Sequence, residues 1–279
     1  MKLAADLQPD QQATRWDNHV AVYETVFEPL SNLFARQALD FLDLRPGHRL
    51  IDIGAGSGGA AMLAAERGAN VLAVDGSAGM VARLRERAAL LASTGHVDAE
   101  VMDGMALILP DASFDAAISV FGVILFPDAD LGMREITRVL RPGGRAAIVT
   151  WTESERYELV TRLLAAITTV RDPQAPLASL PAQLRFRDEG AFRHLLSQSG
   201  LVVERVVRLE KRWCLPSAQW IADHIAFAPG MSAMVGALGA DRDRVLDSFV
   251  STLERDQGCG EVVLTAVAQV GVAVKPGSK

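Results

Sequence analysis

The stretch LIDIGAGSGGAAM, Leu50–Met62, places four glycines within six residues directly after a short apolar run. The apolar run predicts a buried strand over residues 49–53. The glycines permit a sharp turn and a close approach of a ligand to the backbone. The apolar residues after them predict a helix that ends at Gly68, since glycine is a common residue at a helix C-terminus. The stretch therefore predicts a strand, a glycine loop and a helix.

Two spacings fit this loop. Gly54, Gly56 and Gly59 form G-x-G-x-x-G, the pattern with which dinucleotide-binding folds hold a pyrophosphate. Asp52 followed by Gly54, Gly56 and Gly58 forms D-x-G-x-G-x-G. A carboxylate directly before the loop would repel a pyrophosphate, whereas it suits a ligand with an ammonium group or another cationic centre. The second spacing therefore favours a cationic ligand.

Further apolar runs alternate with helical patterns along the first half of the chain. Strands are predicted over residues 71–74, 97–102, 114–120 and 145–150, and two later β-like runs cover 201–209 and 261–274. Strands that alternate with helices in this way predict βαβ units. The expected fold class is α/β, with a doubly wound, mostly parallel, seven-stranded sheet and a helical cap.

Polar residues lie at or near the ends of four predicted strands: Asp52, Asp75, Asp103 and Ser119. In doubly wound sheets a ligand binds outside the carboxyl ends of the strands, so we expect these groups to converge. Asp75 follows Gly54 by 21 residues and is expected to accept hydrogen bonds from ribose hydroxyls. Asp103 is expected to accept one from an adenine amine.

Four segments are expected along the chain. They are an N-terminal helical lid (1–45), the ligand-binding core (46–152), a helical cap with an interspersed core helix and strand (153–258), and a final strand with a tail (259–279). A Pro-rich stretch with Pro173, Pro176 and Pro181 interrupts the third segment. These boundaries follow changes in the periodicity of the apolar residues.

Composition excludes several classes of protein. The 279-residue chain has a formal net charge of −6, so it lacks the basic surface typical of proteins that bind nucleic acid. Cys214 and Cys259 are isolated and show no metal-ligand spacing. No signal-peptide pattern opens the chain, and its longest apolar stretch, 262–274, is shorter than the roughly 20 residues of a membrane span. We expect a cytoplasmic protein with neither a metal nor a membrane span.

Four quoted segments together resemble class I S-adenosylmethionine-dependent methyltransferases: LIDIGAGSGG, VLAVDGSAGMV, VMDGMALILPDASFDAAISVFGVILFPD and EITRVLRPGGRAAIVTW. The resemblance covers about residues 14–152 and is greatest to the small-molecule branch that includes ubiquinone and menaquinone biosynthesis enzymes (methyltransferase type 11). It implies a Rossmann-like sheet and S-adenosylmethionine as the cofactor. The residues expected to bind this cofactor are Tyr23, Asp52, Gly54, Ala55, Gly56, Gly58, Asp75, Gly76, Met80, Asp103, Gly104, Met105, Ser119, Val120 and Phe121.

Apolar side chains of the lid, the end of the core and the cap are expected to bind the methyl acceptor. They are Trp16, Phe27, Phe126, Trp151, Trp220 and Phe227. The same side chains could instead complete the core or form a dimer face, so a homodimer is a further alternative. Many relatives carry a histidine after the fourth strand, where this chain has GVILFPD. The remaining candidate bases are His19 and His224, for which a purely structural role is the alternative.

The sequence thus predicts methyl transfer from S-adenosylmethionine to a hydrophobic small molecule, at oxygen or carbon (EC 2.1.1.-). Such a displacement needs the reacting atoms held in line, and a base only when the acceptor loses a proton early. One alternative is an NAD-dependent oxidoreductase that uses the G-x-G-x-x-G spacing. A second is a protein that binds S-adenosylmethionine without methyl transfer, either a cyclase or a regulator.

Overall fold

Seven strands form one sheet in the computed structural model, which describes residues 7–171 and 182–277. Their order across the sheet is β3-β2-β1-β4-β5-β7-β6. The strands are β1 (Arg49–Ile53), β2 (Asn70–Asp75), β3 (His96–Val101), β4 (Phe114–Val120), β5 (Leu140–Trp151), β6 (Val202–Leu215) and β7 (Val262–Val274). Every predicted strand is present, which confirms the expected fold class.

Strands β1 to β5 pair in parallel, and β7 is antiparallel to both of its neighbours, β5 and β6. The chain leaves β1 for β2 on one side and later returns to β4 on the other side. This reversal leaves a crevice at the carboxyl ends of β1 and β4, where doubly wound sheets bind ligands. The glycine loop after β1 lies at this crevice.

Ten α-helices accompany the sheet in the part of the chain that the structure describes. They are α1 (Val20–Val26), α2 (Glu28–Asp40), α3 (Gly59–Glu66), α4 (Ala78–Ala89), α5 (Ala129–Val139), α6 (Glu158–Val170), α7 (Glu189–Gln198), α8 (Ala218–Asp223), α9 (Pro229–Gly236) and α10 (Arg242–Gln257). Short 3-10 helices include Pro9–Gln11, Ala13–Asn18, Val123–Leu125 and Ala182–Leu184.

Side-chain caps explain where several of these helices begin. Ser77, Asp128, Asp188 and Ser217 each accept a hydrogen bond from a backbone amide in the first turn of α4, α5, α7 and α8, respectively. Such a cap satisfies one of the amides that have no partner within the helix. Helix α7 therefore starts after Asp188, and residues 217–257 contain three separate helices, α8, α9 and α10.

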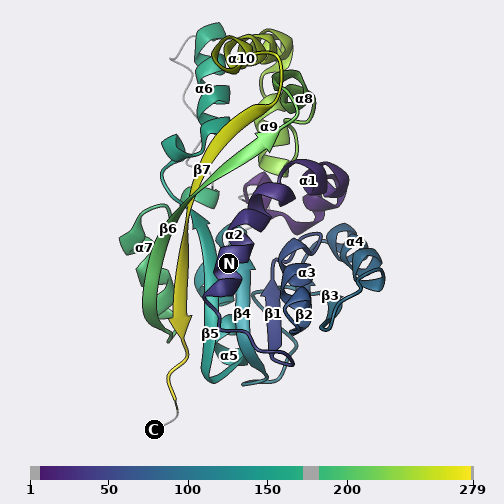
Figure 1. The fold of residues 1–279 in the computed structure, drawn as a ribbon. Helices are drawn as coiled ribbons and strands as arrows, with labels where there is room; N and C mark the ends of the chain where they lie inside the picture. The colour runs from purple at the N-terminus through teal and green to yellow at the C-terminus, as the bar shows by residue number, and fades with distance from the viewer. Residues whose placement is uncertain (1–6, 172–181, 278–279) are drawn as a thin grey trace.

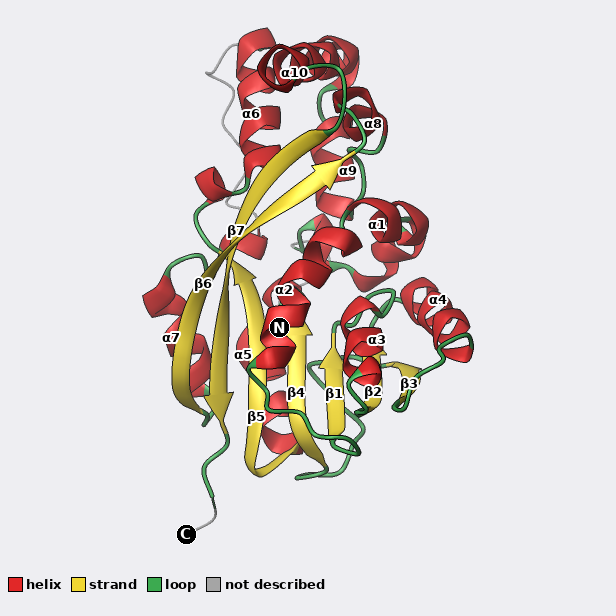
Figure 2. Cartoon of the chain, viewed as in Figure 1, coloured by secondary structure: helices red, strands yellow, loops and turns green. Residues whose placement is uncertain are grey.

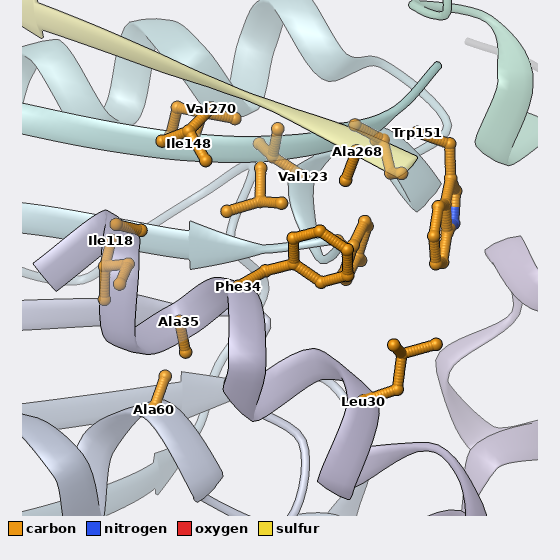
Figure 3. Packing of buried hydrophobic residues seen from close by; sticks show 14 of the residues in the cluster. Leu30, Phe34, Ala35, Ala60, Ile118, Val123, Ile148, Trp151, Ala268 and Val270 are labelled. Atoms are coloured by element: carbon orange, nitrogen blue, oxygen red, sulfur yellow. The ribbon is translucent and has the colours of Figure 1, made fainter. Parts of the chain in front are cut away.

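Helix α2 packs on the sheet rather than over the predicted ligand site. Phe34 and Ala35 are buried, and Figure 3 shows Phe34 pointing from α2 toward the strands and Ala35 pointing toward Ala60 of α3. The predicted lid of residues 1–45 thus divides in two. The part before α2 contains α1 and two 3-10 helices, whereas α2 itself is a core helix.

The helices of the cap lie at the far end of two long strands, β6 and β7. β6 and β7 extend beyond the carboxyl ends of β1 to β5 and meet α6, α8, α9 and α10 at their far end, while α1 lies between this cap and the sheet (Figure 1). Helices α5 and α7 cover the sheet face opposite to α2 (Figure 2). β6 is longer than the predicted 201–209 and reaches Leu215. The Pro-rich stretch with Pro173, Pro176 and Pro181 lies outside the described residues.

One further difference from the predictions has a local cause. The strand predicted over 145–150 begins earlier, at Leu140, so RPGG at 141–144 belongs to β5. The pairing of β4 with β5 shifts there, from Phe114 opposite Leu140 to Ala116 opposite Arg145, so these residues form a bulge. In the described residues no helix is long and apolar enough to cross a membrane.

Candidate functional site

A pocket of about 410 Å³ lies at the carboxyl ends of β1, β2 and β4. It is lined by most of the residues that were expected to bind the cofactor: Tyr23, Gly54, Gly56, Asp75, Gly76, Met80, Asp103, Gly104, Met105, Val120 and Phe121. Its ionisable lining side chains are carboxylates and a phenol, and no Lys, Arg or His of the described residues is among them. The pocket is therefore acidic.

The backbone amides of the glycine loop donate hydrogen bonds to other groups of the protein. The amides of Gly54 and Ala55 donate to the carbonyl oxygen of Val74, at 2.9 and 3.1 Å, and the amide of Gly56 donates to Asp75 Oδ2 at 2.9 Å. Gly54 has a φ of 70°, and a side chain there would come within 2.8 Å of the backbone of Gly122. Glycine is needed at this position because the ends of β1 and β4 approach so closely.

Asp75 ends β2 beside the loop. Its Oδ2 accepts from Gly56 and its Oδ1 accepts from the amide of Ser77 at 2.8 Å. Burial raises the pKa of Asp75 above its ordinary value, although these two amides lower it in part. A carboxylate has about four lone-pair positions, so each oxygen keeps capacity for a hydroxyl donor in the pocket.

The segment Ala13–Asn18 is fixed over this end of the pocket. Asp17 Oδ1 accepts hydrogen bonds from Ser77 Oγ at 2.6 Å and from the amide of Gly79 at 2.8 Å. A side chain at Gly76 would come within 2.9 Å of Ala13. The N-terminal segment is therefore joined to the start of α4 directly beside Asp75.

Asp103 and Phe126 belong to the opposite side of the pocket. Asp103 Oδ1 accepts from the amide of Met105 at 2.9 Å, which fixes the turn after β3. A side chain at Gly104 would come within 2.4 Å of the Phe126 ring, so glycine at this position lets the ring pack against the turn. Asp103 is exposed enough to reach a ligand in the pocket.

Tyr23 covers the glycine loop from α1. Its hydroxyl would be 3.3 Å from a side-chain carbon at Gly56. Burial and the charge of Glu28 raise the pKa of Tyr23, so the hydroxyl keeps its proton at neutral pH. Its ring packs between Trp16, at a centroid distance of 5.8 Å, and Phe27, at 5.6 Å. These three aromatic residues line the pocket on the N-terminal side.

Asp52 and Ala55 lie behind the loop and do not belong to the lining of the large pocket. Both line a small polar cavity of about 10 Å³ together with Tyr23 and Asn32. Asp52 is 1% exposed, and its Oδ2 has no hydrogen-bond partner among the described residues. Burial, with a smaller contribution from Asp75, raises the pKa of Asp52 to about 7. A cavity of this size has room for about one water molecule.

Gly58 and Ser119 shape the site from outside the pocket lining. Gly58 precedes α3 with a φ of 97°, and a side chain there would meet Leu84 at 2.6 Å. Ser119 Oγ donates to the carbonyl oxygen of Ile53 at 2.6 Å and accepts from the amide of Val123 at 3.0 Å. Ser119 thus joins the end of β1 to the turn after β4.

A second, mainly apolar cavity of about 50 Å³ adjoins the large pocket. Aromatic residues from the lid, the core and the cap form its walls: Trp16, Phe27, Phe121, Trp151, Tyr157 and Phe227. The rings of Phe27 and Phe227 are stacked at 5.6 Å, and Trp151 stacks on both Phe121 (4.2 Å) and Tyr157 (4.5 Å). Most of the predicted acceptor residues therefore lie in this cavity or, like Phe126, in the large pocket.

Of the residues predicted as bases or acceptor contacts, three are absent from the lining of both the pocket and the aromatic cavity: His19, His224 and Trp220. The Nδ1–H of His19 donates to the carbonyl oxygen of Arg15, and that of His224 donates to the carbonyl oxygen of Trp220, each at 2.8 Å. Trp220 stacks on the His224 ring at 4.4 Å. Each histidine is thus bound to the backbone four residues before it.

Several pocket residues were not found from the sequence. They include Asp10, Gln11, Gly122 and Tyr157. Gly122 follows Phe121, whose φ of 60° is unusual for a residue with a side chain. Asp10 belongs to the short 3-10 helix Pro9–Gln11, in a polar stretch without a motif. No periodic pattern marks these positions, because they meet the site only through tertiary packing.

The match to a known family agrees with this geometry. Residues 51–148 match the family described as "Methyltransferase domain". This part of the chain is similar to methyltransferase domains. The match supports the resemblance to class I S-adenosylmethionine-dependent methyltransferases and, with it, the expected cofactor.

Individual proteins resemble the chain over different lengths. An uncharacterised protein of Mycobacterium tuberculosis is 29% identical over 238 residues, which cover 82% of each chain. A 2-phytyl-1,4-naphtoquinone methyltransferase of Synechococcus elongatus is 33% identical over 150 residues, or 51% of this chain and 64% of the relative. The crystal structure of the [4+2]-cyclase SpnF is 18% identical, with a TM-score of 0.62 and 98% of each chain covered. The methyltransferase domain thus shares its fold with proteins of differing reactions.

Proposed function

We propose that this protein transfers a methyl group from S-adenosylmethionine to an apolar small molecule, at an oxygen or a carbon atom. The observation that carries the proposal is the charge of the large pocket. Asp10, Asp75 and Asp103 line it, without a basic side chain among the described residues. Carboxylates attract the α-ammonium and sulfonium groups of S-adenosylmethionine and repel phosphates.

The loop geometry favours this cofactor over NAD. A dinucleotide fold leaves loop and helix amides free for the pyrophosphate. Here Gly54, Ala55 and Gly56 donate to Val74 and Asp75 instead. The amide of Ala61, in the first turn of α3, lies close enough to the Asp52 carboxylate to lower its pKa in part. The backbone of Val74 and the carboxylates of Asp52 and Asp75 thus occupy the donors that a pyrophosphate would need.

Different residues would bind different parts of the cofactor. Asp75, with spare lone pairs at the end of β2, would accept hydrogen bonds from the ribose hydroxyls. Asp103 and Met105, in the turn after β3, would hold the adenine, and Gly54 and Gly56 would pack on the methionyl part. Tyr23, with its proton retained, would donate a hydrogen bond above the loop. Bound S-adenosylmethionine supplies a methyl group on a positively charged sulfur.

The acceptor would occupy the aromatic cavity. Trp151 and Phe227 give it apolar walls, and both come from outside the nucleotide end of the pocket. Phe27 and Phe121 line the cavity as well as the pocket, so the acceptor and the methyl group would meet beside these two rings. Stacked apolar walls exclude water and hold a ring-shaped acceptor in line with the transferred group. A relative named as a quinone methyltransferase fits this class of acceptor.

The segment before α2 would act as the lid. Asp17, Tyr23 and Phe27 close the pocket from the N-terminal side, and the charged pairs Glu24–Arg83 and Glu28–Arg87 attach α1 and α2 to α4. We propose residues 7–27, rather than the whole of 1–45, as the lid. The cap of residues 153–258 would supply the outer wall of the acceptor cavity.

Calorimetric titration with S-adenosylhomocysteine, and separately with NAD, tests the cofactor. We expect binding of the first at micromolar concentration and none of the second. Turnover to S-adenosylhomocysteine is then measured with a panel of phenols, quinols and enols. No binding of S-adenosylhomocysteine at millimolar concentration would falsify the proposal. Binding without turnover on any acceptor would favour a cyclase or a regulator.

A further inference from the structure

The aromatic cavity and the large pocket share part of their walls. The shared residues are Asp10, Trp16, Phe27, Phe121 and Leu125. Among these five, Asp10 has the one ionisable side chain. Asp10 therefore lies where the acceptor and the transferred methyl group would meet, whereas His19 and His224 lie outside both linings.

Asp10 is held from two sides. Its Oδ1 accepts a hydrogen bond from the amide of Gly230, in the first turn of α9, at 2.6 Å. Its backbone carbonyl oxygen accepts from Trp16 Nε1 at 3.0 Å. The second carboxylate oxygen, Oδ2, has no hydrogen-bond donor within residues 7–171 and 182–277, so it keeps its capacity to accept a proton from a ligand.

The surroundings of Asp10 make its carboxylate a stronger base than a surface carboxylate. Burial raises the pKa of Asp10, and the Gly230 amide and the charge of nearby His19 offset only part of this effect. No arginine or lysine among the described residues contributes to this balance. A proton on an acceptor hydroxyl is therefore taken up more readily by Asp10 than by a solvated aspartate.

Tyr157 supplies a second polar group to the cavity. Its side chain stacks on Trp151 with an interplanar angle of 9°, and the residue is 8% exposed. Its hydroxyl has no hydrogen-bond partner among the residues described. Buried tyrosine hydroxyls usually find a partner, and leaving one unpaired costs free energy. Tyr157 belongs to the lining of the aromatic cavity, so a molecule bound there is the candidate partner of this hydroxyl.

We propose that Asp10 and Tyr157 together bind an acceptor with a hydroxyl group on an aromatic ring or an enol, Asp10 accepting the hydroxyl proton and Tyr157 donating a hydrogen bond to an oxygen of the same molecule. The inference rests on the proposed function and deepens it by naming the acceptor class and the base. A hydroxyl group has one proton to donate and lone pairs to accept with, which matches one carboxylate and one phenol.

The acidity of their hydroxyl group distinguishes phenols and enols from aliphatic alcohols as acceptors. A phenol has a pKa near 10, so a carboxylate of raised pKa beside a positive charge is an adequate base. An aliphatic alcohol is a far weaker acid. The stacked rings of Phe27, Phe227, Trp151 and Tyr157 also match a flat molecule better than a saturated one.

Transfer of the methyl group to oxygen begins at the acceptor hydroxyl. The acceptor O–H bond breaks and its proton goes to Asp10 Oδ2. The acceptor oxygen forms the new bond to the methyl carbon, and the electron pair of the broken carbon–sulfur bond goes to the sulfur, which loses its positive charge. Asp10 afterwards releases the proton to solvent. When the nucleophile is a ring carbon, the same proton removal makes the ring electron-rich. The methylated carbon then loses its hydrogen as a proton, and a proton returns to the oxygen, which restores the hydroxyl and the aromatic ring.

A ligand comparison on the wild-type protein tests the inference without turnover. Calorimetric titration with 1-naphthol and with 1-methoxynaphthalene is carried out in the presence of saturating S-adenosylhomocysteine. The two ligands share the ring and one oxygen, but the ether cannot donate a proton. We expect 1-naphthol to bind about tenfold more tightly, since a hydrogen bond to a charged group is worth roughly this factor or more.

Substitutions at Asp10 and Tyr157 measure how much each side chain contributes to the affinity for the acceptor. Asp10→Asn is expected to lower the affinity for 1-naphthol about tenfold and to leave that of the ether unchanged. Tyr157→Phe is expected to lower both affinities, because the ether oxygen also accepts from Tyr157. Asp98→Asn, an exposed aspartate on β3, serves as the matched control and should change neither. Asp10→Glu restores a carboxylate and should recover part of the preference.

The outcomes separate this inference from the proposed function. Equal affinity of the wild-type protein for the two ligands, or no binding of either, overturns the acceptor class even when S-adenosylhomocysteine binds. Unchanged preference for 1-naphthol in a folded Asp10→Asn variant overturns the role of Asp10. Failure to bind S-adenosylhomocysteine contradicts the proposed function itself. Because the first comparison uses the wild-type protein, a variant that fails to fold does not void the test.

Discussion

Arg87 on α4 and Glu28 at the start of α2 form a two-pronged ion pair around the glycine loop. Arg87 Nη1 lies 2.7 Å from Glu28 Oε2, and Nη2 lies 2.8 Å from Oε1. Arg87 Nη1 also donates to the carbonyl oxygen of Ser57 at 2.8 Å, and Ser57 Oγ donates to Glu28 Oε2. The loop that lines the pocket is thus clamped between two helices from outside.

Removal of Arg87 is expected to destabilise the protein strongly. The Glu28 side chain is only 7% exposed, so Arg87→Ala leaves a buried carboxylate with a single hydroxyl donor. The loss of one partner of a buried pair costs about 3–5 kcal/mol. Urea unfolding of Arg87→Ala measures this loss. Arg193→Ala, which breaks an exposed pair with Glu189, is the control and should change the free energy of unfolding little. Equal effects of the two variants would contradict a structural role of the Glu28–Arg87 pair.

Asp75→Asn is expected to weaken the binding of S-adenosylhomocysteine by about 10- to 100-fold. The substitution removes the charge that would accept from the ribose hydroxyls, and hydrogen bonds to a charged group contribute about 1.5–3 kcal/mol each. It also replaces an oxygen that accepts from Gly56 or Ser77 by a nitrogen that cannot accept. Calorimetric titration gives the affinity, with Asp98→Asn as the control. A folded Asp75→Asn protein with wild-type affinity would exclude Asp75 from the cofactor site.

The residues around β1 were predictable because they follow a local rule. A strand of apolar residues ends at a tight turn, and the spacing of the glycines and acids then places Gly54, Asp75 and Asp103 at one edge of the sheet. Asp10 was not predictable in this way, because its contact with Gly230 joins residues 220 positions apart. The position of such a residue depends on how the lid and the cap meet.

The two predicted histidines lie outside the lining of both the pocket and the aromatic cavity. His19 and His224 were chosen by residue type, since histidine is a common general base. In the fold each ring nitrogen Nδ1 donates to a carbonyl oxygen in the preceding helical turn, at Arg15 and Trp220. Sequence alone carries no signal for this choice of partner. Asp52 lies near the end of β1, as predicted, but its side chain lines the small polar cavity behind the loop.

Asp52 is expected to make the stability of the protein depend on pH. An unfolded aspartate ionises near 3.8, whereas Asp52 in the folded protein keeps its proton until about pH 7. Between these values the folded state binds more protons than the unfolded state, so stability falls as pH rises through this window. The contribution is fully present below pH 3.8 and is lost above pH 7.

Asp52→Asn removes this titration. Relative to wild type, the variant is expected to gain stability as the pH rises from 4 to 7 and to keep a constant advantage above 7, on the order of 2–4 kcal/mol from a shift of this size. Urea unfolding at pH 5, 6, 7 and 8 measures the difference. A wild-type minus variant difference that does not vary with pH would show that Asp52 is ionised throughout.

Phe227→Leu is expected to weaken acceptor binding without weakening cofactor binding. Phe227 stacks on Phe27 in the aromatic cavity and does not belong to the lining of the large pocket. Leucine keeps most of the apolar volume but loses the flat ring, and an aromatic pair contributes about 0.5–1.5 kcal/mol beyond its buried area. The affinity for 1-naphthol should fall roughly three- to tenfold, whereas that for S-adenosylhomocysteine should stay within twofold.

Phe249→Leu is the matched control for this prediction. Phe249 is 1% exposed on α10 of the cap and lines neither the pocket nor the cavity. Both variants replace a buried phenylalanine, so both should lose stability by a similar amount, which thermal unfolding measures. Because only Phe227 faces the cavity, only Phe227→Leu should change the affinity for 1-naphthol. An equal loss of 1-naphthol affinity in both variants would mean that acceptor binding reports on the stability of the cap, and the aromatic cavity would then lose its assignment as the acceptor site.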